Sequence, residues 1–280
     1  MQTSDINHAI QTNVRTALAE DIGSGDLTAQ LIFPDQIAHA TLIAREAAVL
    51  CGRPWFEACF TALDPDIKFK WRVDEGTDFA ANVTLCEISG NARAILSAER
   101  PALNFLQTLS ATASNTRRFV QAITGTAALI MDTRKTLPGL RLAQKYAVKT
   151  GGGANQRMGL FDGVLIKENH IAAAGSIGAA LAAAQRQTPP GVSIQIEVES
   201  LAELEQALAA GAHLILLDNF DPEQLRTAVQ LTNKRAVLEA SGGISFDNVR
   251  AIAECGVDRI SIGGLTKHVQ AVDFSLQIKT

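Results

Sequence analysis

The sequence predicts two domains, an N-terminal α+β sandwich domain followed by an incomplete (open) α/β barrel. In the first third of the chain, strand-like segments follow one another with little helix between them, whereas after Gly125 short apolar runs alternate with segments of helical periodicity. Of the 280 residues, 47% are hydrophobic, which suits one large or two modest domains. We expect residues 1–113 to form the first domain, with residues 270–280 packing on it, and residues 114–269 to form the barrel.

The first domain begins with a predicted helix in which Ile10, Val14 and Leu18 recur at helical spacing. Strand-like segments then follow at residues 40–44, 67–73, 83–88 and 92–97, and they predict an antiparallel sheet. Residues 101–123 carry leucines at helical spacing and predict one long helix that starts at Pro101.

The barrel is predicted from six short apolar runs, each ending in a polar residue or glycine, at Asp132, Lys167, Glu197, Asp218, Ser241 and Gly263. Helical segments lie between most of them, at residues 172–185, 201–210, 222–231 and 246–255. Such alternation is typical of a (β/α) barrel or an open doubly wound sheet, in which right-handed crossovers place all carboxyl ends of the strands on one side. Six strands are fewer than the eight of a complete barrel, so an open barrel is favoured.

The sequence gives little support for a membrane protein, a secreted protein or a small domain stabilised by zinc or disulfides. No apolar run approaches the ~18 residues of a membrane span, and the first thirty residues lack the apolar region of a signal peptide, which predicts a cytoplasmic protein. The four cysteines have no C-x-x-C spacing and the five histidines are scattered, so we expect neither a zinc site nor a disulfide framework.

A local excess of positive charge points to an anionic ligand. No Asp or Glu occurs from Thr133 to Phe161, although the net charge of the protein is −4. The cations of this acid-free segment are Arg134, Lys135, Arg141, Lys145, Lys149 and Arg157. Turns at Pro138-Gly139 and at the triplet Gly151-Gly152-Gly153 allow the backbone to bend around a ligand.

The last two strand ends predict a phosphate site. Ser241-Gly242-Gly243 precedes a helix near Phe246, and Gly263-Gly264 precedes a helix near Thr266. In barrels, backbone N–H groups of these loops commonly hold a phosphate. Carboxylates that end two adjacent strands, Glu197 and Asp218, are suitable oxygen ligands for Mg²⁺ beside a phosphate. Glu199 is expected to be a solvated acid at a helix start.

These residues carry a resemblance. The segments 132–141 (DTRKTLPGLR), 144–148, 151–155, 165–170, 196–199, 216–219, 239–244 and 261–266, with 20–28 and 99–104 upstream, resemble quinolinate phosphoribosyltransferases over nearly the whole chain. The resemblance implies a pentosyltransferase that forms nicotinate mononucleotide, pyrophosphate and carbon dioxide from quinolinate and phosphoribosyl pyrophosphate in NAD biosynthesis. It also implies Mg²⁺ and a homodimer with a site shared across the interface.

By the same resemblance, the substrate contacts are Arg100, Thr133, Arg134, Lys135, Arg157 and Lys167, and Arg45 reaches across the dimer. Glu197 and Asp218 face the ribose and its Mg²⁺, and the loops Ser241–Gly243 and Ile262–Gly264 hold the 5-phosphate. Lys135, Lys167, Glu197 and Asp218 are the expected catalytic residues. Lys145 and Lys149 are expected along the approach or at a subunit contact.

The sequence departs from the family at Gln156, where the glycine-rich segment more often continues Asn-His-Arg. Glutamine donates a hydrogen bond but cannot become a cation, so a role for this position as a positive charge at the quinolinate carboxylates is in doubt.

Two readings from other classes compete. A nucleic-acid-binding module would use the acid-free segment to track phosphates, but few aromatic residues lie among its cations and the pI is near 5.8. A barrel lyase or aldolase would use Lys167 as a Schiff-base nucleophile. Within the family, nicotinate or another anion could replace quinolinate.

Overall fold

The structure is a computed structural model that describes residues 3–279, and these divide into two compact units. The first comprises the residues up to Arg117, the segment Leu137–Gly152 and the residues from His268 onward; the second comprises Arg118–Thr136 and Gly153–Lys267. The segment Leu137–Gly152, which we expected in the barrel domain, therefore groups with the first unit. No helix within the described residues is long and apolar enough to cross a membrane.

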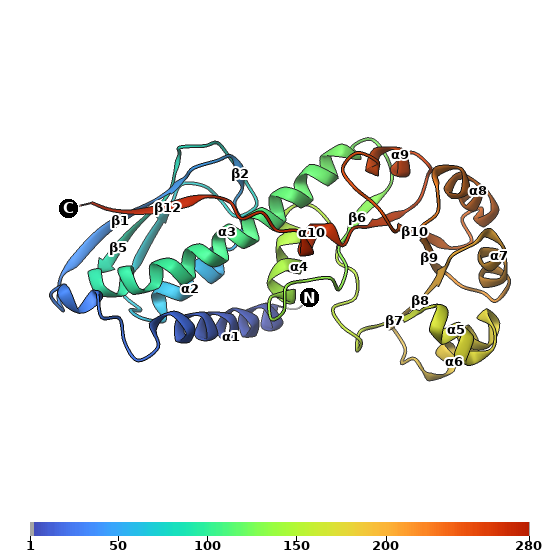
Figure 1. Ribbon diagram of the computed structural model, residues 1–280, viewed down its shortest axis with the longest axis horizontal. Helices are drawn as coiled ribbons and strands as arrows, with labels where there is room; N and C mark the ends of the chain where they lie inside the picture. The colour runs from blue at the N-terminus through green and yellow to red at the C-terminus, as the bar shows by residue number, and fades with distance from the viewer. Residues whose placement is uncertain (1–2, 280) are drawn as a thin grey trace. The chain divides into compact units, whose positions relative to one another are not determined.

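The first unit is built on a four-stranded antiparallel sheet in the order β12-β1-β5-β3. The last strand of the chain is an edge of this sheet, with Phe274 opposite Ala44 and Ile278 opposite Ala40 (Figure 1). A separate pair joins β2 to β4. The bounds are β1 (Ile37–Ala44), β2 (Ala48–Val49), β3 (Lys68–Trp71), β4 (Asp78–Phe79), β5 (Thr84–Asn91) and β12 (Phe274–Lys279).

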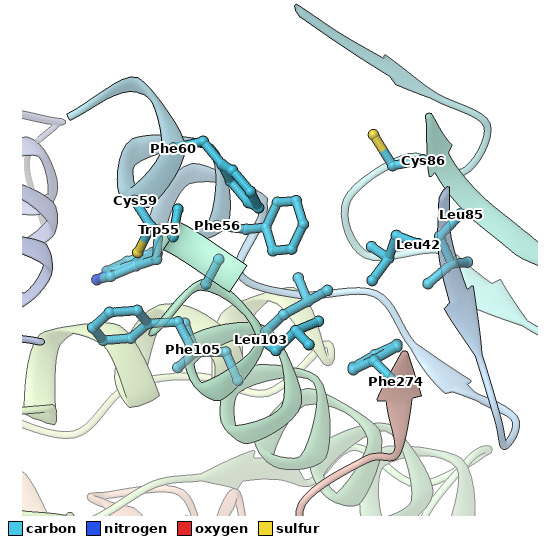
Figure 2. Packing of buried hydrophobic residues seen from close by; sticks show 14 of the residues in the cluster. Leu42, Trp55, Phe56, Cys59, Phe60, Leu85, Cys86, Leu103, Phe105 and Phe274 are labelled. Atoms are coloured by element: carbon cyan, nitrogen blue, oxygen red, sulfur yellow. The ribbon is translucent and has the colours of Figure 1, made fainter. Parts of the chain in front are cut away.

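The helices of this unit pack on the sheet through an aromatic and aliphatic core. Figure 2 shows Trp55, Phe56 and Phe60 of α2 gathered with strand residues such as Leu42 and Leu85, all of them fully buried. The Phe56 and Phe60 ring centroids are 5.0 Å apart. Burial of each such side chain contributes roughly 1.5–3 kcal/mol to the free energy of folding. The helical segments are α1 (Thr3–Ile22), the 3-10 turn η1 (Ala29–Leu31), α2 (Arg53–Thr61) and α4 (Arg141–Thr150).

The helix α3 (Ala92–Ala122) corrects two predictions, because residues 92–97 are helical rather than a strand and Pro101 lies inside the helix rather than at its start. Its amino end is capped by Asn91, whose Oδ1 accepts hydrogen bonds from the backbone nitrogens of Arg93 and Ala94 at 3.0 and 3.2 Å. One fully buried face continues across the proline, formed by Ile95, Ala98, Ala102, Leu106 and Leu109. This burial outweighs the roughly 3 kcal/mol that an interior proline costs a helix.

The second unit contains the predicted open barrel. Its six strands are all parallel, in the order β6-β11-β10-β9-β8-β7, and they confirm the six predicted runs. The helices α5 to α9 lie outside the strands, and β6 and β7 are the two edges of the sheet (Figure 1). The strands are β6 (Leu129–Met131), β7 (Gly163–Ile166), β8 (Ser193–Val198), β9 (Leu214–Asp218), β10 (Val237–Ser241) and β11 (Arg259–Ser261).

The helices of the second unit differ from the prediction in two places. The helix expected at residues 172–185 is broken at Gly175, which has φ +88, and Ser176 starts the next helix by accepting a hydrogen bond from the Ala179 nitrogen. The helix expected from residue 246 begins only at Val249. The bounds are α5 (Glu168–Ala174), α6 (Ile177–Gln187), α7 (Leu201–Ala209), α8 (Pro222–Thr232), α9 (Val249–Ala253) and α10 (Gly264–Lys267).

Part of the acid-free segment connects the two edge strands of the open barrel. Ala154 pairs with β6, since its nitrogen donates to the Ile130 carbonyl at 2.8 Å and its carbonyl accepts from the Asp132 nitrogen at 3.1 Å. Three residues later, Arg157 Nη1 donates to the carbonyl of Gly163 at the start of β7, at 2.9 Å. Residues 154–163 therefore span the opening that six strands leave.

Candidate active site

The register of the parallel strands aligns the polar side chains at their carboxyl ends. Leu165 lies opposite Gln195, so two residues further on Lys167 and Glu197 follow on the same face of neighbouring strands. Lys167 Nζ donates to both carboxylate oxygens of Glu197, at 2.8 and 2.7 Å. The Glu197 side chain is only 9% exposed, whereas that of Lys167 is 44% exposed. The Lys167 side chain is therefore partly accessible to a ligand, whereas its partner Glu197 is almost buried.

A cavity of about 630 Å³ in the second unit brings together three of the predicted cations, Arg134, Arg157 and Lys167. Its other walls are largely apolar, with Leu160 and Phe161 among them. Burial lowers the pKa of Arg157, and the nearby charge of Arg134 lowers it further. Because arginine stays protonated at neutral pH, the two like charges remain close together. A bound anion would relieve this repulsion, so the cavity is suited to a negatively charged ligand.

The predicted Thr133 and Lys135 lie beside the end of β11. A methyl group added at Gly263 would lie 2.8 Å from Lys135 Cδ and 3.6 Å from Thr133 Oγ1. The Thr266 hydroxyl donates to the Lys135 carbonyl at 2.7 Å, and the Lys135 nitrogen donates to Thr133 Oγ1 at 3.0 Å. The loop after β6 is thereby tied to the Gly263-Gly264 loop, where the sequence predicted a phosphate.

The second predicted phosphate loop requires glycine at residue 242. Gly242 has φ +94, and an added methyl would lie 2.8 Å from the backbone nitrogen of Asn219. That nitrogen donates to the Ser241 carbonyl at 2.9 Å, and Asn219 Nδ2 donates to Asp218 Oδ2 at 2.9 Å. Asn219, itself at φ +58, therefore couples the loop to Asp218. The sequence analysis assigned Asn219 no role, although it lies in one of the motifs that carry the family resemblance.

Beneath the acid-free segment lies a polar cluster that the sequence analysis did not identify, formed by Gln156, Gln195 and Glu239. Gln156 Nε2 donates to Glu239 Oε1, and Gln195 Nε2 donates to Glu239 Oε2 at 3.0 Å. Glu239 is fully buried and Gln195 is 4% exposed. The side chain of Gln156, at the position where the family more often has histidine, is therefore held by a buried acid. The signal was the alternation along β8 and β10, which places Gln195 and Glu239 on the same face as Glu197 and Ser241.

The remaining predicted cations lie in the first unit. Arg45 and Arg100 are exposed residues of the first unit. Lys149 is exposed, but Lys145 is fully buried, so the expectation that Lys145 lies along the approach or at a subunit contact is wrong. Lys145 falls on the inward face of α4, between the buried residues Gln144 and Ala147.

The residues predicted to hold Mg²⁺ fit that ion only in part. Both oxygens of Glu197 accept hydrogen bonds from Lys167, whereas Asp218 is held by the neutral amide of Asn219. Within residues 3–279, no group of three or more His, Cys, Asp or Glu side chains is arranged to hold a metal. Mg²⁺ keeps several waters and commonly binds through one carboxylate and substrate phosphates. Asp218 suits that mode, and the donor set does not form a complete protein cage.

Comparisons with known proteins agree over almost the entire chain. The family model described as "Quinolinate phosphoribosyl transferase, N-terminal domain" matches residues 26–110, and the model for the C-terminal domain of that family matches residues 112–277. The sequence is 40% identical to the "Nicotinate-nucleotide pyrophosphorylase [carboxylating]" of Mycobacterium leprae, over 96% of this chain and 97% of that protein. It is also 40% identical to the probable enzyme of that name from Bacillus subtilis, over 92% and 90%.

Solved structures give the same result. The nicotinate-nucleotide pyrophosphorylase from Francisella tularensis superposes with a TM-score of 0.94 at 45% identity, covering 98% of this chain and 97% of the other. The enzyme from Ehrlichia chaffeensis superposes with a TM-score of 0.91 at 38% identity, covering 100% and 99%. Human nicotinic acid phosphoribosyltransferase, at 13% identity and a TM-score of 0.66, shares the fold.

Proposed function

The chain belongs to the quinolinate phosphoribosyltransferase family, and from that premise we propose that it is the carboxylating nicotinate-nucleotide pyrophosphorylase of NAD biosynthesis. It would convert quinolinate and phosphoribosyl pyrophosphate to nicotinate mononucleotide, pyrophosphate and carbon dioxide. The observation that carries the proposal is the cavity lined by Arg134, Arg157 and Lys167 in a barrel of this family. Quinolinate is a planar dicarboxylate, and guanidinium groups match carboxylates in charge and in geometry.

Binding of the two anionic substrates follows from this charge. Each charge-assisted hydrogen bond contributes roughly 1.5–3 kcal/mol, and the repulsion between Arg134 and Arg157 is relieved when a carboxylate lies between them. Thr133 and Lys135 lie beside Gly263, so they can contact a phosphate held by that loop. The loop at Ser241 to Gly243 supplies backbone N–H groups near Asp218.

The reaction requires a leaving group to depart from C1 of the ribose and the pyridine nitrogen to attack that carbon. As the bond from C1 to the diphosphate oxygen breaks, positive charge develops on the sugar, and the carboxylates of Glu197 and Asp218 at the strand ends can stabilise it. Lys167 fixes the direction of the Glu197 carboxylate by donating to both of its oxygens. The C2 carboxylate then leaves as carbon dioxide, its bonding pair stays on the ring carbon beside the cationic nitrogen, and that carbon takes up a proton. No separate general base is assigned.

We treat Mg²⁺ as arriving with the diphosphate of the substrate. When bound, it neutralises charge on the leaving pyrophosphate. Asp218 would contact it directly or through water, and Glu197 would act mainly through Lys167.

A homodimer is proposed because both units expose large apolar side chains. In the first unit Leu27, Leu31 and Phe33 are at least 80% exposed, and in the second unit Leu160 and Phe161 are 74% and 83% exposed. Exposed apolar groups of this size mark interaction surfaces. By the family resemblance, the first unit of one subunit would cover the barrel of the other, and Arg45 would reach across to that site. We also propose a cytoplasmic location, because such highly charged substrates do not cross a bilayer unaided.

The rival lyase reading is disfavoured by the ion pair of Lys167. Schiff-base formation needs the lysine nitrogen to be available to attack a carbonyl, whereas Lys167 Nζ is held by both oxygens of Glu197. Borohydride in the presence of keto acids should therefore leave Lys167 unmodified.

The proposed activity is tested by incubating the protein with Mg²⁺, phosphoribosyl pyrophosphate and either quinolinate or nicotinate, and measuring nicotinate mononucleotide by chromatography. We expect product from quinolinate and at least a hundredfold lower rate from nicotinate, which lacks the second carboxylate. Product formed only from nicotinate would refute the assignment.

A further inference from the structure

A buried carboxylate inside the second unit has no role in the reaction described above. Glu239 lies on β10, is fully buried, and is not among the described residues that line the cavity of Arg134 and Arg157. Its oxygens accept hydrogen bonds from two neutral amides, those of Gln156 and Gln195. Burying a carboxylate is costly unless it is well hydrogen-bonded, so this group needs both donors.

The same contacts fix residue 156 at two points. Its side-chain nitrogen donates to Glu239, and its backbone nitrogen donates to Asp132 Oδ1 at 2.8 Å. Asp132, at the end of β6, is also fully buried. Two buried acids, one on β10 and one directly after β6, thus hold one residue of the segment that crosses the barrel opening.

The next residue along the chain is Arg157, which lines the cavity and donates to the Gly163 carbonyl at 2.9 Å. Because adjacent Cα atoms are a fixed 3.8 Å apart, the position of Gln156 limits where the guanidinium of Arg157 can lie. A misplacement of about 1 Å can cost a binding or catalytic group a hundredfold in effect.

We propose that Glu239 is a positioning residue for the dicarboxylate substrate, and that it acts by holding the amide of Gln156 so that Arg157 is directed into the cavity. The inference rests on the proposed function. It assigns Gln156 a second role besides any contact with substrate, since its Nε2 is engaged with the buried acid. Glutamine meets the requirement at this position because the cluster needs a hydrogen-bond donor rather than a cation.

The test is a double-mutant cycle in the full-length protein, with Glu239→Ala, Gln156→Ala and the combined variant. Each single change should raise KM for quinolinate about tenfold and leave kcat and KM for phosphoribosyl pyrophosphate within about twofold. The combined variant should be no worse than the more severe of the two single variants. An equal rise of both KM values, or effects that multiply in the double variant, would overturn the proposal.

Stability is controlled for by Ser110→Ala, which removes a fully buried hydroxyl of the first unit whose oxygen accepts from the Cys51 nitrogen at 3.0 Å. This variant should lower the thermal midpoint without changing KM for quinolinate. If Glu239→Ala does not fold, the Glu239→Gln variant tests the proposal instead, because it keeps the shape of the side chain and one acceptor. It should raise KM for quinolinate about threefold. An unchanged KM would overturn the proposal. A parent protein without activity refutes the function itself, whereas an active parent with insensitive variants refutes only the role of Glu239.

Discussion

The Gly242→Ala variant tests whether the loop after β10 holds the phosphate of the sugar substrate. Gly242 is at φ +94, and an added methyl would lie 2.7 Å from Asn219 Cγ and 2.8 Å from its backbone nitrogen. Because φ +94 lies well beyond the usual left-handed value near +57, a non-glycine residue here costs about 2 kcal/mol, the upper end of the left-handed penalty. Displacing the Asn219 side chain also breaks its hydrogen bond to Asp218, which is worth about 1 kcal/mol. Together these make about 3 kcal/mol, or roughly a hundredfold in affinity for phosphoribosyl pyrophosphate.

The matched control is Gly243→Ala. Gly243 is also left-handed, at φ +57, but no described atom lies within 4 Å of an added methyl. Only the backbone cost of about 1 kcal/mol applies, so the loss should be about fivefold. Isothermal titration with phosphoribosyl pyrophosphate and Mg²⁺ measures both dissociation constants. Equal losses in the two variants, or a Gly242→Ala effect on quinolinate alone, would refute the reasoning.

Four further outcomes are expected. Arg134→Ala should raise KM for quinolinate about 30- to 100-fold, because Arg134 lines the cavity. Arg141→Ala should raise it less than threefold, because Arg141 is not among the residues that line the cavity. Equal losses would indicate that the acid-free segment acts only through its overall positive potential. Lys167→Met should lower kcat/KM at least about a hundredfold, because it leaves an almost buried carboxylate without its partner. Gln156→His should retain or raise kcat/KM near pH 6, and a clear fall there would count against the account. Hydrogen bonds from the Ala29 backbone nitrogen and from the Ser97 hydroxyl lower the pKa of Asp26. Asp26→Asn should therefore lower the urea midpoint of unfolding at neutral pH. The difference in midpoint between variant and parent should shrink as the pH falls through the folded-state pKa of Asp26.

The strands of the barrel were predictable because a parallel sheet buried on both faces leaves a strong signal. Five of the six apolar runs end in a polar residue at the carboxyl end of the strand, and the register of β7 and β8 explains why Lys167 lies beside Glu197. Two of the cavity cations, Arg134 and Arg157, belong to the acid-free segment, which is unusual in an acidic protein. Lys167 was predicted as a strand-end residue, and the assignment of all three to the substrate came from the family resemblance.

Features that depend on how side chains pack and bond in the folded protein were not predictable. The helical state of residues 92–97 depends on the Asn91 cap and on a buried face that continues past Pro101, whereas the local pattern suggested a strand. Likewise, Glu239 and Gln156 are 83 positions apart, and only the folded barrel shows that one holds the other. The break at Gly175-Ser176 was a local signal that the alanine-rich composition around it obscured.

The most direct measurement of the central claim is the fate of the C2 carboxylate. With quinolinate labelled with ¹³C in that group, phosphoribosyl pyrophosphate and Mg²⁺, the protein should release one labelled carbon dioxide for each nicotinate mononucleotide formed, and none when phosphoribosyl pyrophosphate is withheld. Mononucleotide that retains the label, or labelled carbon dioxide formed without the sugar substrate, would contradict the account.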